Sequence, residues 1–103
     1  MSSSPTKSER LSKEQVESEL LKLKMGWTLS EDGKEIIRAF EFNGFYKTMG
    51  FVNSIAWIAQ KERHHPDMEV SFNKCIVHYT THDANGLTAN DFKCAMQIEA
   101  LLD

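Results

Sequence analysis

The sequence lacks the features that mark several common functional classes. It has only two cysteines, Cys75 and Cys94, in 103 residues, and they form no CxxC pair or other zinc-binding pattern. Basic residues are not in excess: 12 lysines and arginines are outnumbered by 15 aspartates and glutamates, which gives a net charge of -3. This balance disfavours direct binding to nucleic acid or to an anionic membrane surface.

Long apolar runs are also missing. No stretch approaches the roughly 18 consecutive apolar residues of a membrane-spanning helix, and residues 1–15 contain no apolar segment typical of a secretory signal. The five glycines are scattered along the chain and form no phosphate-binding loop. Because two free thiols are typical of a reducing compartment, we expect a cytoplasmic protein, with the nucleus as the alternative location.

What the sequence does contain is enough apolar material for one domain. Apolar residues make up 41% of the chain and charged residues 26%, both ordinary for a soluble globular protein. Residues 1–11 are serine-rich and include Pro5, a composition that predicts a flexible tail. The folded domain is therefore expected at residues 12–103.

Three stretches have the periodicity of amphipathic helices. The first is expected over residues 13–24, after a capping box formed by Ser12 and Gln15. The second is expected over residues 45–62, with Asn43 as its cap, and the third follows Thr88, with Asp91 at its third position. The second helix is apolar on most sides. Its core-facing stripe is expected to comprise Phe45, Met49, Val52, Ile55, Ala56 and Ala59, with Phe51, Trp57 and Ile58 on a second buried face.

Two hairpins fill the intervals between these helices. Strands are expected at residues 27–29 and 35–42, and again at 68–72 and 75–82, where apolar and polar residues alternate. The order α-β-β-α-β-β-α predicts an α+β fold, in which a four-stranded antiparallel sheet carries three helices on one face.

All four histidines lie between His64 and His82. A metal centre is disfavoured, because no HExxH is present and His78 and His82 would stand about 13 Å apart along a strand. A cysteine nucleophile is disfavoured as well, since Cys75 is expected to face the helices and Cys94 lies within a helix. The alternatives left open are structural roles and acid–base chemistry, which suits histidine near neutral pH.

Several short motifs resemble those of the pterin-4a-carbinolamine dehydratase family, whose members are also known as dimerisation cofactors of a homeodomain transcription factor. The matching residues are His64-His65-Pro66, Asn73-Lys74, Thr81-His82-Asp83, Gly86-Leu87-Thr88 and Asp91, with Gly26-Trp27 and Gly50-Phe51 at fitting positions. The resemblance implies dehydration of 4a-hydroxytetrahydrobiopterin to quinonoid dihydropterin and water, in the recycling of tetrahydrobiopterin for aromatic amino-acid hydroxylases. It implies neither a metal nor a bound cofactor.

The resemblance also implies roles for single residues. His64 and His82 would be the catalytic acid–base pair, whereas His65 and Asp91 would bind the substrate. Asp91 has an equally good interpretation as a carboxylate at a helix N-terminus. The chain departs from many relatives at three positions: an acidic residue is common in place of Gln60, Asp or Asn in place of Arg63, and Trp in place of Met68 in animal relatives.

The expected partners are a pterin substrate and further copies of the chain, as a dimer or tetramer. The alternative function is that of an oligomeric binding module, which acts as a dimerisation cofactor or transcriptional coactivator. A transcription factor or an aromatic amino-acid hydroxylase would then be the protein partner. The intact set of three matched histidines favours the enzyme, because a pure adaptor has no chemical need for it.

Overall fold

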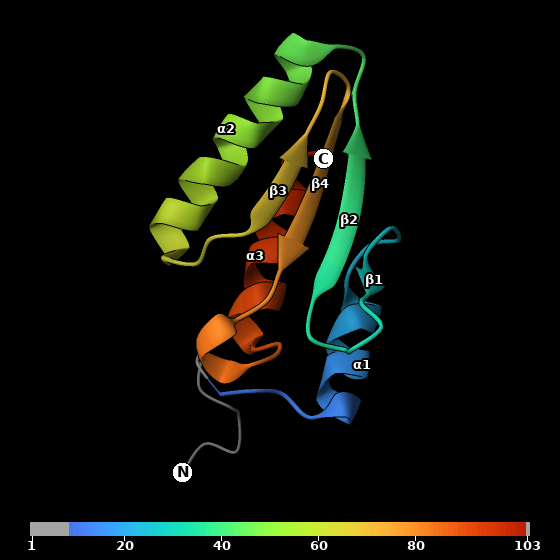
Figure 1. Cartoon of the computed structure of the whole chain (residues 1–103), viewed down its shortest axis with the longest axis vertical. Coiled ribbons are helices and arrows are strands. Elements are labelled where there is room, and N and C mark those ends of the chain that lie inside the picture. The colour runs from blue at the N-terminus through green and yellow to red at the C-terminus, as the bar shows by residue number, and fades with distance from the viewer. Residues whose placement is uncertain (1–8, 103) are drawn as a thin grey trace.

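The structure is a computed structural model that describes residues 9–102, so most of the predicted tail lies outside the described residues. Its elements are shown in Figure 1. In chain order they are α1 (Lys13–Lys22), β1 (Thr28–Leu29), β2 (Ile36–Glu41), α2 (Phe45–Glu62), β3 (Asp67–Val70), β4 (Lys74–Tyr79), the 3-10 turn η1 (His82–Ala84) and α3 (Ala89–Ala100). This order confirms the predicted α+β fold.

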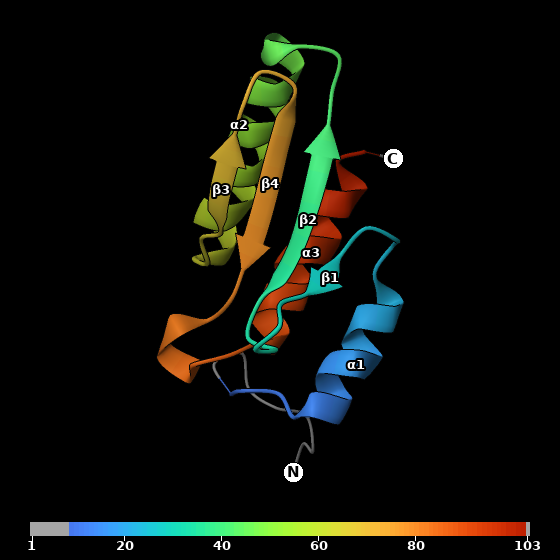
Figure 2. The same ribbon diagram turned by 45° about the vertical axis from the view of Figure 1, so that its right-hand side comes forward.

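The four strands form one antiparallel sheet in the order β1-β2-β4-β3. Figure 1 shows α3 behind the sheet, and in the turned view of Figure 2 α2 also lies behind β3 and β4; α1 lies beside β1 in both views. The end of α1 is tied to α3, because the backbone N–H of Lys24 donates to Glu99 Oε2 at 2.7 Å. Within residues 9–102, no helix is both long and apolar enough to cross a membrane.

Strand β4 runs through the centre of the sheet and has the predicted alternation. Cys75, Val77 and Tyr79 are fully buried beneath the helices, whereas Ile76 and His78 lie on the opposite face. Both cysteines are free and buried, and burial raises the pKa of each thiol. These thiols therefore pack as small apolar groups and are not poised as nucleophiles.

Helix α2 has the predicted bounds, and Ile55 and Ala59 of the predicted core stripe are buried, as are Phe51 and Ile58 of the predicted second face. The predicted burial of Phe45, Ala56 and Trp57 was wrong. The buried residues are Thr48, Phe51, Ile55, Ile58 and Ala59, whereas Phe45 and Trp57 are 52% and 65% exposed. Contacts with the sheet determine which side of α2 is buried. The ring of Phe51 packs on Phe40 and Phe42, at centroid distances of 4.7 and 4.9 Å.

Two local predictions near helix ends also differ from the structure. The cap of α2 is Gly44 and not Asn43. Leu11, assigned from sequence to the tail, is buried, and its N–H donates to the carbonyl of Leu87 at 2.8 Å. The capping box of Ser12 and Gln15 is confirmed.

His82 was predicted to end a strand, and this was wrong. Strand β4 ends at Tyr79, and His82 begins the turn η1. Asn85 closes the turn in the left-handed region, with φ of 55°, and the Thr81 and Gly86 backbones then pair. The turn lifts His82 away from the plane of the sheet.

His78 on the open face of the sheet contacts carboxylates from two other segments. Its Nδ1 lies 3.0 Å from Glu35 Oε1, just before β2, and its Nε2 lies 2.6 Å from Glu69 Oε2 on β3. Burial lowers the pKa of His78, but the two carboxylates more than offset this effect, and the net shift is upward. Protonated His78 thus links β4 to β3 on one side and to the segment before β2 on the other.

This cluster predicts a pH dependence of stability. A group with a raised folded-state pKa stabilises fully below its unfolded value of about 6.5, and this contribution is lost as the pH rises through the folded value. In urea titrations between about pH 5.5 and pH 8.5, the free energy of unfolding of the wild type relative to His78→Gln should fall with rising pH. Glu69→Gln should weaken the trend. An equal slope in the wild type and in His78→Gln would contradict it.

Candidate active site

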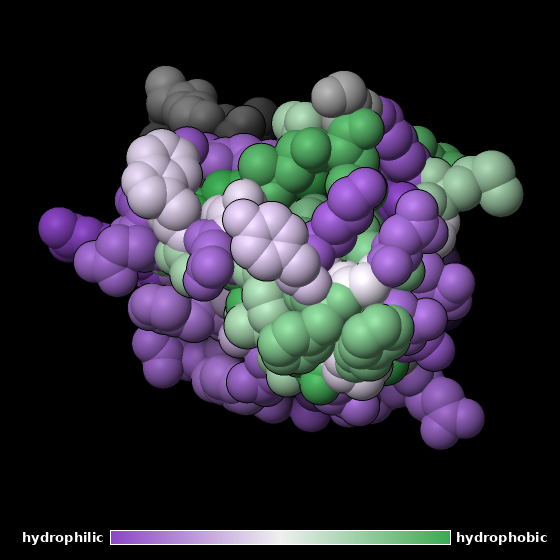
Figure 3. Space-filling view, turned by 90° about the horizontal axis from the view of Figure 1, so that it is seen from above, coloured by the Kyte–Doolittle hydropathy of each residue, from purple (hydrophilic) through white to green (hydrophobic). Residues whose placement is uncertain are grey.

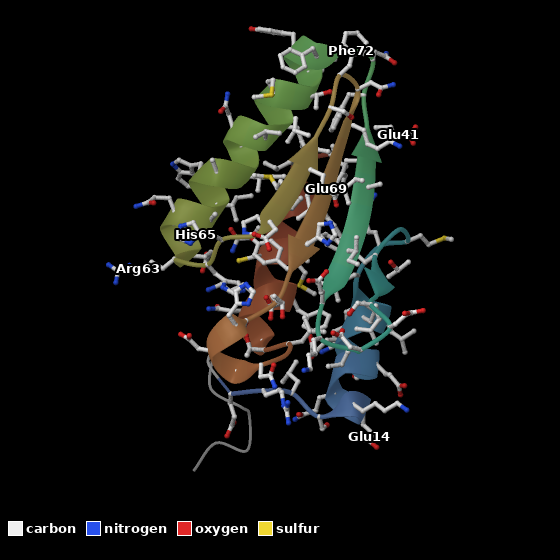
Figure 4. The ribbon with its side chains drawn as sticks, in the orientation of Figure 1. Glu14, Glu41, Arg63, His65, Glu69 and Phe72 are labelled. Atoms are coloured by element: carbon white, nitrogen blue, oxygen red, sulfur yellow. The ribbon has the colours of Figure 1, made fainter. Side chains whose placement is uncertain are left out.

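The end of α2 directs His64 toward the sheet. Arg63 closes the helix in the left-handed conformation, with φ of 55°. The next backbone N–H, that of His64, donates to the carbonyl of Ala59 at 3.0 Å. The left-handed cap at Arg63 and the following Pro66 together turn the chain sharply at the end of α2. Figure 4 shows His65 at this corner and Arg63 directed outward.

Tyr79 holds the His64 imidazole from one side. The two rings stack with centroids 5.2 Å apart, and the Tyr79 hydroxyl donates to the His64 carbonyl at 3.2 Å. Burial strongly raises the pKa of Tyr79. The phenol is therefore a neutral donor near neutral pH.

Asp91 holds the same imidazole from behind. Its side chain is 0% exposed, and its Oδ1 lies 2.5 Å from His64 Nε2. Its Oδ2 accepts from the Thr81 hydroxyl at 2.8 Å and from the Thr88 backbone N–H at 2.9 Å. Because a carboxylate only accepts, Nε2 of His64 must carry a proton, which leaves Nδ1 as the second ring nitrogen for a ligand.

The three matched histidines line one cavity of about 270 Å³. His64 is mostly buried in its wall, whereas His65 and His82 are exposed at its rim. The remaining lining residues are Arg63, Thr80, Thr81 and Asp83. Segments 63–65 and 80–83 thus meet where β4 ends, so one side of the cavity is fixed by packing and the other is open to solvent.

Asp91 is the predicted site residue that does not line this cavity. Its burial and its bonds place it behind His64, so it acts on the site through that ring. Sequence reasoning missed Thr81, whose hydroxyl also lies 2.8 Å from the Thr88 hydroxyl. Its position beside His82 in the matched motif was the available signal, but only the folded chain shows its contact with Asp91.

Among residues 9–102, no group of three or more His, Cys, Asp and Glu side chains is arranged to hold a metal ion. Three carboxylates near the histidines are already bonded: Asp91 to His64, and Glu35 and Glu69 to His78. The site therefore offers proton-transfer groups on a preformed frame.

The sequence matches a known protein family. The model of the family described as pterin 4 alpha carbinolamine dehydratase matches residues 9–101. The chain belongs to this family. It is accordingly an enzyme of the hydro-lyase class, and its substrate is a pterin, as the sequence predicted.

Individual relatives agree with this assignment. A protein of Legionella pneumophila strain Corby, provisionally named a pterin-4-alpha-carbinolamine dehydratase, is 54% identical over 92 residues, which cover 89% of this chain and 81% of that protein. One from Nitrosomonas eutropha with the same provisional name is 48% identical, with coverage of 89% and 80%. The crystal structure of a transcriptional coactivator/pterin dehydratase from Brucella melitensis is 32% identical with a TM-score of 0.86, and covers 91% of this chain and 99% of that chain.

The Asp91 contacts predict a stability effect. In Asp91→Asn, the amide NH₂ replaces one carboxylate oxygen, so either a buried donor loses its partner or His64 must move its proton to Nδ1. In both cases the hydrogen bonds to a charged acceptor are lost. We expect the free energy of unfolding, measured in urea at pH 7, to fall by about 1–3 kcal/mol. The matched control is Asp83→Asn at an exposed aspartate, where the change should stay within about 0.5 kcal/mol. Equal stability of both variants would refute this role of Asp91.

Proposed function

We propose that this enzyme converts 4a-hydroxytetrahydrobiopterin to quinonoid dihydropterin and water by histidine acid–base catalysis, in the recycling of tetrahydrobiopterin. The C4a–O bond breaks and the hydroxyl leaves as water after it takes a proton. N5 loses its proton, and a C4a=N5 double bond forms. The observation that carries the proposal is that His64, His65 and His82 share one cavity.

His64 is suited to take or give a proton at a fixed position. Its Nε2 is engaged by Asp91 and its ring is stacked on Tyr79. The carboxylate behind the ring stabilises the positive charge that forms when Nδ1 takes a proton, as in other carboxylate–histidine pairs. Asp91 is therefore proposed as a positioning residue, which replaces the substrate contact implied by the resemblance.

His82 is suited to the second proton transfer. It is exposed on η1, at the rim of the same cavity. An exposed imidazole exchanges protons with water readily, so it can be reset between turnovers. His65, exposed at the end of α2, is proposed to bind the pterin ring. The proposed reaction needs no metal and no bound cofactor.

Single substitutions should separate these roles. We expect His64→Ala and His82→Ala each to lower kcat by ~10²–10⁴, the usual loss of an acid–base group. His65→Ala should mainly raise KM, because it removes binding common to the ground and transition states. The measurement is the ultraviolet absorbance of synthetic 4a-hydroxytetrahydropterin during dehydration, with unfolding curves to confirm that each variant is folded.

The double variant tests whether the two histidines act together. If each serves one ring face, single variants should discriminate between the 4a stereoisomers and the double variant should lose both activities. If they act on one molecule, the double variant should be little worse than the poorer single variant. Near wild-type turnover of both stereoisomers by His64→Ala/His82→Ala would end the proposal.

The cellular setting is proposed from the state of the two cysteines. Two buried free thiols suit a reducing compartment, so we expect the enzyme in the cytoplasm, with the nucleus as the alternative. A role as dimerisation cofactor or coactivator is the second candidate function. This candidate is supported by the similar Brucella melitensis structure, whose protein is described as both a transcriptional coactivator and a pterin dehydratase.

Self-association is supported by exposed apolar side chains on and beside α2. Trp57 and Leu101, which are 65% and 41% exposed, line a groove of about 410 Å³ between α2 and α3. Phe45 and Phe72 are exposed near the start of α2, and Figure 3 shows hydrophobic side chains gathered on this end of the molecule. Strand β3 is an edge strand, which is open to pairing.

We therefore expect a homo-oligomer, a dimer or tetramer, at micromolar concentration. Light scattering coupled to gel filtration would give the mass. Trp57→Lys should shift the mass toward the monomer, because it puts a charge on the exposed apolar groove. Lys13→Met, on the exposed surface of α1, is the control. A wild-type protein that stays monomeric at these concentrations would rule the expectation out.

A further inference from the structure

A second, smaller cavity of about 170 Å³ adjoins the histidine cavity. The two share Thr80 and His82 as lining residues, so they are neighbouring parts of one depression. The other residues of the second cavity are Asp32, Lys34, Glu35, Asn85 and Gly86. We propose that this cavity binds the hydroxylated side chain at C6 of the pterin, an inference that rests on the proposed function.

The order of atoms in the pterin ring favours placing the C6 side chain in this second cavity. In a 4a-hydroxytetrahydropterin, C6 is joined to N5, and N5 is joined to the reacting carbon C4a. C6 is therefore only two bonds from the carbon that loses its hydroxyl, and the first atom of a C6 side chain is three bonds away. With C4a held in the histidine cavity, a C6 substituent starts close to the reaction centre, and the second cavity, which shares Thr80 and His82 with the first, is the adjoining space.

The lining of the second cavity suits hydroxyl groups. Asp32 and Glu35 supply carboxylate oxygens that accept from hydroxyls, whereas the Lys34 ammonium and the Asn85 amide donate. None of the side chains in this cavity is a large apolar group. Two carboxylates beside one ammonium also disfavour an anionic tail. The chemistry therefore matches a short polyol.

Hydrogen bonds to the backbone and to other side chains hold these groups in place. Thr80 Oγ1 donates to the Lys34 carbonyl at 2.5 Å, and Lys34 Nζ donates to Asn85 Oδ1 at 3.3 Å. Asp32 Oδ1 accepts from Ser30 Oγ at 2.7 Å and from the Lys34 N–H at 3.0 Å. The bonds from Ser30 and from the Lys34 backbone lower the pKa of Asp32. The acceptor is thus present, ionised and oriented before a ligand arrives, which reduces the cost of binding.

The test compares two substrates that differ only at C6. One carries a dihydroxypropyl group and the other a methyl group. The variants are Lys34→Met, which keeps the carbonyl that binds Thr80, and Asn85→Gly, which tolerates the positive φ of this position. The KM for the dihydroxypropyl substrate relative to the KM for the methyl substrate should rise about tenfold in Lys34→Met, the usual effect of losing one hydrogen bond to a charged group. In Asn85→Gly it should rise by a smaller factor, about two- to tenfold, because the lost bond is between neutral groups.

Lys47→Met, on the exposed surface of α2, is the matched control and should leave both KM values unchanged. Equal KM changes for the two substrates in Lys34→Met and Asn85→Gly would overturn the subsite. Binding of the two corresponding fully oxidised pterins, measured by calorimetry, gives a readout that does not depend on turnover. A preference for the dihydroxypropyl pterin that Lys34→Met abolishes would support the subsite even if the dehydratase assay failed, and equal affinities of the wild type would refute it.

Discussion

The buried carboxylate of Asp91 joins three segments that are far apart in the sequence. It lies in the first turn of α3, accepts from the N–H of the capping residue Thr88, and contacts Thr81 after β4 and His64 after α2. A buried carboxylate with fewer donors would cost several kcal/mol. The arrangement at the end of β4 is therefore coupled: displacing any one of the three donors leaves the charge less well solvated and affects the positions of the other two.

This coupling divides the cavity into a fixed and an open side. His64 lies between a buried carboxylate and a stacked phenol ring, so its orientation is set before substrate binds. His65 and His82 are exposed on the chain corners that flank it. A dehydration needs one group at a defined angle to the reacting atoms and another that exchanges protons with solvent. In the proposed mechanism, the fixed side would meet the first requirement and the open side the second.

The sequence predicted the order of elements, the bounds of α2 and the gathering of His64, His65 and His82, because these depend on local periodicity, helix punctuation and motif spacing. It predicted two buried faces of α2 but not which residues of each face are buried, since an apolar helix can bury several faces. Phe51 packs on Phe40 and Phe42, whereas Phe45 and Trp57 are exposed. Nor did it predict η1. The alternation through Thr81 favours a longer strand, whereas the chain turns because Asn85 adopts a left-handed conformation. The contact of Thr81 with Asp91 depends on both features and was therefore invisible.

The fourth histidine shows why a histidine cluster does not define an active site by itself. His64 and His78 both contact carboxylates, but the contacts differ in number. Both ring nitrogens of His78 face carboxylates, Glu35 and Glu69, so both carry protons and neither is free to exchange one with a ligand. His64 faces one carboxylate through Nε2 and keeps Nδ1 available beside the cavity. The same residue type therefore stabilises the sheet at one position and suits proton transfer at the other, and the difference lies in the single extra carboxylate.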